Sequence, residues 1–148
     1  MMDAVLSCQA DGGIRDLVRS RGLGDVYKRQ MMHAASSLII RAIKHLAEIP
    51  PRLELLPSNI IESLRNFKTD ILGEKSVSLD LEEALVALSI SATANPAAQI
   101  ALEKIRDLSG CEMHMTHIPT PGDDAGLRRI GVNLTSDPNF ATNNLFIS

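Results

Sequence analysis

The chain has 148 residues, of which 45% are hydrophobic, and its formal net charge is −3 at pH 7. A mildly acidic chain has no electrostatic attraction to nucleic-acid phosphates or to anionic membranes, so we expect neither as a partner. No apolar run approaches the roughly 18 residues that a membrane-spanning helix needs. The composition therefore indicates a small globular unit, and the cytoplasm is the expected compartment.

The first 30 residues read as if they were not of protein origin. Ser20–Gln30, SRGLGDVYKRQ, resembles the translation of an adapter used in transposon-based DNA sequencing libraries. Gln9–Asp16 agrees at six of eight positions with QAEDGIRD, the translation of a second library primer. We therefore predict that residues 1–30 are a non-native, disordered segment and exclude them from fold prediction. The rest of the chain, residues 31–148, has a net charge of −4 and is expected to form one truncated domain.

The cysteines lead to an expectation about redox state. Cys8 lies in the excluded segment, so Cys111 is the single cysteine of residues 31–148. A lone cysteine cannot form an intrachain disulfide, and its presence favours a reducing compartment.

The first half of residues 31–148 predicts two helices and a strand. Apolar side chains recur at helical spacing over residues 31–47, which predicts a mostly buried helix that ends before Pro50. Residues 52–56, RLELL, form a short apolar run between prolines and predict a buried strand. Ser58 is expected to cap a second helix that closes at Gly73.

The second half carries clear helix-start signals. Asp80 and Glu83 have the spacing of a capping box, in which each side chain accepts from the other residue's backbone N–H, and a helix should follow. Asn95 can cap the next helix, with Pro96 at its first position. Thr120 begins a second capping-box pattern, T-P-G-D, which predicts a short helix to Gly131.

Two further strands are expected around this last helix. Residues 111–118 alternate enough for a strand, and residues 132–135 predict another. Strands that alternate with helices indicate an α/β fold with a small parallel or mixed sheet covered by helices.

Long stretches of the chain resemble a known family. They are RLELLPSNIIESLRNFKTDILGEKS, LDLEEALVALSISATANPAAQIALEKI and GCEMHMTHIPTPGDDAGLRRIGVNLTSDPNF. They are similar to the carboxyl-terminal region of the bacterial domain of unknown function 1846 family, also called uncharacterised protein family 0371. The resemblance implies a three-layer α/β sandwich subdomain, with a topology likened to that of cytidine deaminases, cut from a much longer protein. It implies no reaction, cofactor or catalytic residue, and makes the missing amino-terminal region the first expected partner, with a second copy of the chain as the other candidate.

The deaminase-like topology raises the question of zinc. Zinc deaminases need an H-x-E motif followed by two cysteines in a P-C-x-x-C arrangement. Residues 31–148 contain no H-x-E and a single cysteine, so we expect no metal site.

Three polar residues remain as candidates for a site. His114 and His117 lie near the carboxyl end of the predicted strand, and Thr120 lies in the loop that follows, where α/β sheets often bind ligands. The competing interpretation is that the histidines are hydrogen-bonded at a strand edge or interface and that Thr120 caps a helix. Two functions follow. The leading hypothesis is a structural or interaction role of this subdomain in its parent, and the alternative is a small-molecule enzyme site that the missing amino-terminal region completes.

Overall fold

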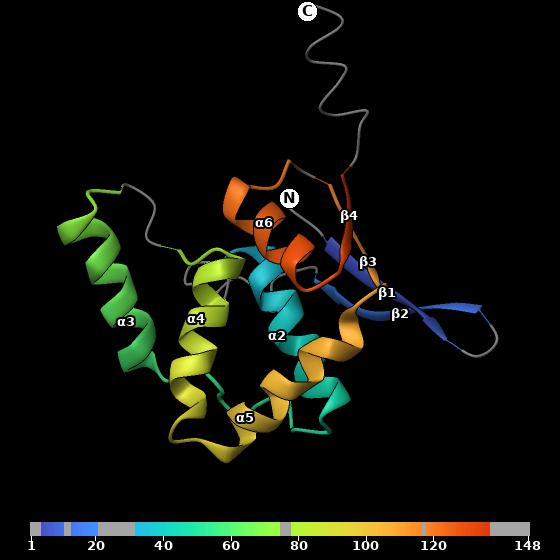
Figure 1. Cartoon of the computed structure of the whole chain (residues 1–148), viewed down its shortest axis with the longest axis horizontal. Coiled ribbons are helices and arrows are strands. Elements are labelled where there is room, and N and C mark those ends of the chain that lie inside the picture. Colours follow the sequence, from blue (N-terminus) through green and yellow to red (C-terminus); the bar gives the residue numbers. More distant parts are fainter. Residues whose placement is uncertain (1–3, 11–12, 21–31, 75–77, 117, 137–148) are drawn as a thin grey trace, which may run out of the picture.

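A small mixed sheet forms one side of the molecule and helices form the other (Figure 1). The computed structural model describes residues 4–10, 13–20, 32–74, 78–116 and 118–136. Its strands are β1 (Ala4–Ala10), β2 (Gly13–Ser20), β3 (Glu112–Met115) and β4 (Asn133–Ser136), in the order β2-β1-β3-β4. β1 runs antiparallel to β2 and β3, whereas β3 and β4 are parallel. The predicted α/β class and mixed sheet are therefore confirmed.

The amino-terminal hairpin corrects one expectation. We expected residues 1–30 to be disordered, but Ala4–Ala10 and Gly13–Ser20 pair as strands, and β1 is central in the sheet. Ala4 and Leu6 are buried in the core because alternate β1 side chains face the helices. Residues 1–3, 11–12 and 21–30 lie outside the described residues. The adapter origin of the segment stays a prediction.

The cysteine expectation was also wrong. Cys8 of β1 and Cys111, just before β3, form a disulfide across 103 positions of sequence. The error arose because Cys8 had been excluded together with its segment. The argument for a reducing compartment rested on a lone thiol, so the disulfide removes its basis.

The described residues form five α-helices, which lie on the side of the molecule away from the sheet. They are α2 (Ala34–Leu46), α3 (Ser58–Asn66), α4 (Leu81–Ala92), α5 (Pro96–Glu103) and α6 (Pro121–Arg129). A π-helical turn, η2 (Phe67–Ile71), continues α3, and a 3-10 turn, η3 (Lys104–Leu108), continues α5. From the sheet outward the order is α2, then α4, then α3 (Figure 1).

Helix α2 is the centre of the core. Ten of its thirteen residues are buried, since it contacts the hairpin on one side and α4 and α5 on the other. Burial on nearly every side is the position of a central core helix. Helices cover one face of the sheet in the described part of the chain, and on its other face Glu112 and His114 of β3 are exposed.

The predicted strand over residues 52–56 is absent. The segment is a run of turns and bends in which Leu55 and Leu56 are buried. Its backbone bonds are local or to side chains: Leu53 N donates to the Pro50 carbonyl, and Ser91 Oγ donates to the Leu55 carbonyl at 2.6 Å. A short apolar run between prolines can be a buried loop as readily as a strand.

The helix starts agree with their sequence signals, with one exception. Asp80 and Glu83 form the reciprocal capping box at α4, and the Asn95 side chain accepts from Ala97 N at α5. Ser58 does not cap α3. It is the first helical residue, and Pro57 stands in the capping position without a side-chain bond.

Candidate functional site

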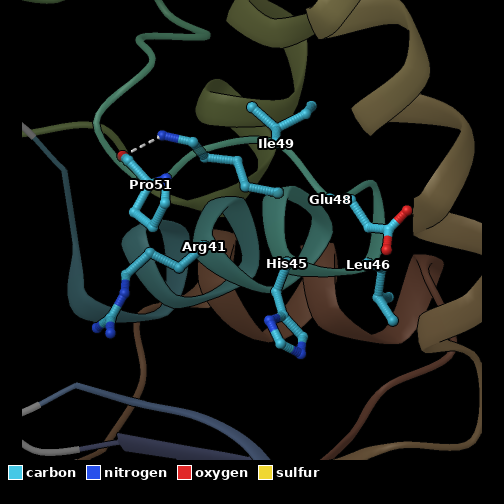
Figure 2. Close-up of a pocket in the computed structure, with 7 residues that line it drawn as sticks. Arg41, His45, Leu46, Glu48, Ile49 and Pro51 are labelled. Atoms are coloured by element: carbon cyan, nitrogen blue, oxygen red, sulfur yellow. Dashed lines mark hydrogen bonds between the residues drawn. The ribbon is translucent and has the colours of Figure 1, made fainter.

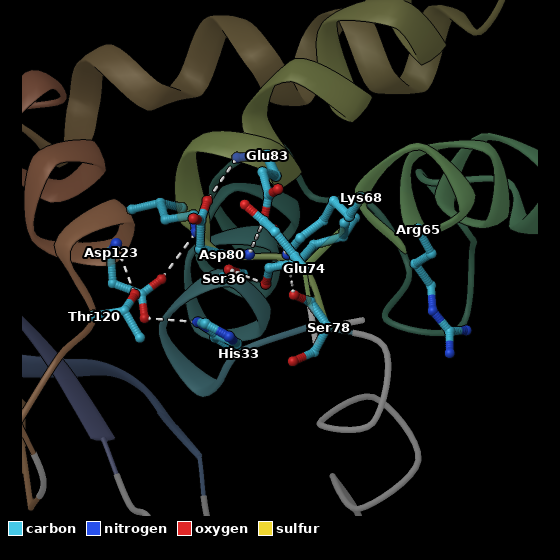
Figure 3. Close-up of polar contacts among 12 residues, drawn as sticks. His33, Ser36, Arg65, Lys68, Glu74, Ser78, Asp80, Glu83, Thr120 and Asp123 are labelled. Atoms are coloured by element: carbon cyan, nitrogen blue, oxygen red, sulfur yellow. Dashed lines mark hydrogen bonds and ion pairs between the residues drawn. The ribbon is translucent and has the colours of Figure 1, made fainter. Parts of the chain in front are cut away.

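The starts of α2, α4 and α6 meet in a group of bonded polar side chains, which we call the helix-start cluster (Figure 3). It consists of His33, Asp80, Glu83, Thr120 and Asp123. Asp123 is its central member. One carboxylate oxygen lies 2.9 Å from His33 Nδ1, and the other accepts from the backbone N–H of Leu81 at 2.9 Å. A single buried carboxylate thus joins the first turn of α6 to the starts of α2 and α4.

The bonds of Asp123 modify the second predicted capping box. Thr120 Oγ1 accepts from Asp123 N at 3.2 Å, as the pattern predicts. In a complete box the Asp123 side chain would return to the backbone of Thr120. Its two oxygens instead bond to His33 and Leu81, so half of the box is used to connect helices that are far apart in the sequence.

Electrostatics favours the charged forms of the His33–Asp123 pair. The hydrogen bond to Asp123 raises the pKa of His33 above its usual value, and this outweighs the opposing effect of burial. Burial alone would raise the pKa of Asp123, but the hydrogen bond and the charge of His33 bring that pKa below its usual value. Burial raises the pKa of the neighbouring Asp80. Each partner of the pair thus favours the charged form of the other.

A buried lysine extends the cluster towards η2. Lys68 is only 6% exposed, and its Nζ donates to Glu83 Oε1 at 2.8 Å and to the Ser78 carbonyl at 2.9 Å. Glu74 lies 3.6 Å from the same nitrogen. The charge of Lys68 is thus compensated within the fold, which ties η2 to the start of α4.

Close packing accompanies these bonds. A Cβ added to Gly122, in the first turn of α6, would collide with the carboxylate of Asp80. A larger residue at this position would have to displace the Asp80 carboxylate, which caps α4.

The residues predicted from sequence do not share a bonding partner among the described residues. His114 is exposed, and its Nδ1 lies 2.9 Å from Thr135 Oγ1 on β4. Thr120 caps α6. His117 lies outside the described residues. The pair that the sequence analysis missed, His33 and Asp123, is separated by 90 positions, and the only local signal was the place of Asp123 in a capping pattern.

A hollow lies at the carboxyl end of α2 (Figure 2). It measures about 630 Å³ and is lined by Arg41, Lys44, His45, Leu46, Glu48, Ile49 and Pro51. Lys44 Nζ donates to the Pro51 carbonyl at 2.5 Å, which closes the loop after the helix. Glu48 ends the helix with a φ of 58°, a conformation that glycine usually supplies. Lys44 thus serves loop closure.

Metal sites and membrane-spanning helices are absent from the described ranges. No three His, Cys, Asp or Glu side chains gather there in a way that could hold a metal ion. Among the helices of the same ranges, none is long and apolar enough to cross a bilayer.

Fold and cluster together define a small α/β domain whose buried polar groups bond to one another across helix starts. The family model described as "Domain of unknown function DUF1846, C-terminal" matches residues 27–146, and the chain belongs to this family. It is 44% identical over 116 residues to a UPF0371 protein of Clostridium botulinum strain Alaska E43, a match that covers 78% of this chain. It is 40% identical over 118 residues, 80% of this chain, to a UPF0371 protein of Clostridioides difficile strain 630. The matched region spans only 23% and 24% of those relatives.

Proposed function

We propose that the chain is the carboxyl-terminal structural and interaction subdomain of a longer protein, and that one helical face is covered by the preceding part of that protein. We call the part of a full-length family protein before the matched domain the upstream region. The observation that carries the proposal is the apolar outer face of α4.

Helix α4 has too few polar residues for a surface helix. Residues 84–92 contain no charged side chain, and Val86 and Ile90 are 52% and 46% exposed on the side away from α2. These two residues are one turn apart and form a continuous stripe. Helices with apolar side chains on all faces belong in an interior, so this stripe supports a covering partner.

The stripe borders a groove next to η2. The groove measures about 360 Å³, and its apolar wall includes Phe67, Leu72 and Val86, all about half exposed. Glu82 and Glu83 also line the groove, and their carboxylates already pair with Arg129 and Lys68. An amphipathic helix with apolar anchors has the complementary chemistry. The upstream region is the occupant we propose, because some three quarters of a full-length relative lies outside the matched domain.

The helix-start cluster supports the same role. Asp123, His33 and Lys68 hold the start of α4 against α2, α6 and η2. These bonds fix the position of the helix that carries the apolar stripe. A rigid helix is a better docking surface than a mobile one, because less conformational entropy is lost on binding.

The test compares one substitution in two settings. In the 148-residue chain, Val86→Lys should change the free energy of unfolding by no more than about 0.5 kcal/mol, since the side chain is half exposed. In a full-length family protein the equivalent substitution should cost about 2 kcal/mol or more, because it buries an unpaired charge. Chemical denaturation measures both. Gln99→Lys, an equal charge change on the exposed side of α5, is the matched control and should be neutral in both.

Two results would overturn the proposal. One is an equally small effect of Val86→Lys in the full-length protein. The other is a dimer of the 148-residue chain, seen by analytical ultracentrifugation, that Val86→Lys dissociates, since this would assign the stripe to a second copy.

One observation favours the alternative function, a small-molecule site completed by the upstream region. Within the described residues, His33 Nε2 has no bonded partner, while Nδ1 is oriented by Asp123. A histidine oriented by a carboxylate is a common arrangement for a general base. Under this alternative, a structure of a full-length family protein should show the equivalents of His33 and Thr120 in one water-accessible concavity. Finding His33 Nε2 packed against apolar side chains there would exclude it.

A further inference from the structure

The sheet contains a strand that the family domain itself does not supply. We propose that the edge of β3 facing β1 is a strand-acceptor site, which in full-length family proteins holds an extended segment of the upstream region. The proposal deepens the interaction role proposed above and names a second surface on which it acts.

The limits of the family match are the first observation. The match begins at residue 27, so both β1 and β2 lie outside the family domain. Of the described strands, only β3 and β4 fall within it, each four residues long. Two short strands make a marginal sheet, and stable sheets need more strands or additional packing. The family domain therefore depends on pairing from elsewhere.

Burial at the β1–β3 contact is the second observation. Ala4 lies opposite Met115 and Leu6 opposite Met113, and all four side chains are at most 1% exposed. β1 also contacts the central helix α2. Without a strand in this position, Met113 and Met115 would be exposed to solvent where the hairpin now covers them. Whatever occupies the edge must supply similar side chains.

The direction of the backbone groups is the third observation. Asn133 N donates to the Cys111 carbonyl, so this carbonyl faces β4, while the Cys111 N–H donates to the Leu108 carbonyl in the preceding turn. Because N–H and C=O groups alternate in direction along a strand, those of Met113 also face β4. The groups of Glu112 and His114 then face β1, opposite Ser7 and Val5. An empty edge would leave these donors and acceptors available for another strand.

These observations define the chemistry of the occupant. It is an extended segment antiparallel to β3, with small or aliphatic side chains at alternate positions, as in Ala4 and Leu6, and no proline between them. The upstream region is the source we propose, because the matched domain makes up only 23% of the length of a full-length relative. A second copy of the chain is the competing source, and its pairing would depend on protein concentration.

The decisive measurement is amide hydrogen exchange in a full-length family protein. We expect the amides equivalent to Glu112 and His114 to exchange as slowly as those equivalent to Met113 and Met115, within about tenfold. Slow exchange at the two methionines together with unprotected exchange at Glu112 and His114 would show an open edge and overturn the proposal. Protection that disappears on dilution would assign the edge to a second copy and also overturn it.

A matched pair of variants tests the edge in the 148-residue chain. Val5→Pro removes the backbone N–H opposite His114, so the amides of Glu112 and His114 should exchange at least about tenfold faster. Val5→Ala keeps that N–H and should change their exchange little. Equal exchange in the two variants would contradict the pairing. The result is independent of the Val86→Lys test, because the edge of β3 and the stripe on α4 are separate surfaces, so either idea can fail alone.

Discussion

The hairpin consists of β1 and β2, and we call the remaining described elements, α2 to β4, the helical body. The two parts are held in the molecule by different means. In the body, capped helix starts are joined by Asp123, Lys68 and the packing around α2. The hairpin is attached through the edge of one four-residue strand, through its packing against α2 and through the Cys8–Cys111 disulfide. The body is specified by residues within the family match, whereas the sheet is completed from outside it. A domain can thus hold its helices in place and still need a strand from elsewhere.

The largest expected effect comes from two core leucines, one in the body and one in the hairpin. Leu38 of α2 and Leu6 of β1 are both fully buried. Leu38→Ala should lower the free energy of unfolding by about 4 kcal/mol, because it leaves a cavity in the centre of the body. Leu6→Ala should cost clearly less, since release of the hairpin limits the loss. Denaturation followed by circular dichroism measures both, with the exposed Leu53→Ala as control. Equal costs for Leu6 and Leu38 would mean that hairpin and body unfold as one unit.

The disulfide should have the next largest effect. Cys8→Ser should destabilise the chain by about 3 kcal/mol, because it removes a cross-link that closes a long loop. Before reduction, thiol titration of the denatured chain should detect no free thiol, since both cysteines of the sequence are bonded. Two titratable thiols would show that hairpin and body are not covalently joined.

Loss of the helix-start cluster, which belongs to the body alone, should destabilise the chain less than the two changes above. Asp123→Ala should cost about 2 kcal/mol, because the buried N–H of Leu81 and the ring of His33 lose their acceptor. Asp124→Ala, one residue further on, should change stability by less than about 0.5 kcal/mol, since it removes only an exposed pair with Arg128. Similar costs for the two variants, measured by denaturant unfolding, would contradict the central position of Asp123.

The smallest effect is a dependence on pH. The pKa of His33 is raised in the folded chain, so its pairing with Asp123 contributes to folding stability. This contribution is complete below the unfolded pKa of 6.5 and is lost as the pH rises through the folded pKa. The lowered pKa of Asp123 keeps that contribution until the pH falls below about 3.8. Stability should therefore fall as the pH rises from about 5.5 to about 8.5, and His33→Gln should abolish this fall. His45→Gln, at an exposed site on α2, should retain it.

Local signals account for what the sequence predicted correctly. Asp80 with Glu83, Asn95 with Pro96, and Thr120 each mark a helix start with side chains a few positions from the groups they bond. The same signals say nothing about contacts across the fold. The pairing of His33 with Asp123 therefore came only from the structure.

Two other differences have identifiable physical reasons. Residues 52–56 have the composition of a strand, but the segment is a buried loop in which the Ser91 hydroxyl, and no neighbouring strand, bonds to the Leu55 carbonyl. The hairpin was not predicted because residues 1–30, interpreted as adapter-derived, were also expected to be disordered. A segment of foreign origin can still pair with an open strand edge, because backbone groups recognise any extended chain.

The disulfide also gives the chain the connectivity of a ring. The bond between Cys8 and Cys111 encloses α2, α3, α4 and α5 in one covalent circuit. A protease that cuts once anywhere in that circuit opens the ring without releasing a fragment. The cleaved protein should keep its mass, apart from one added water, until a reductant separates the two pieces.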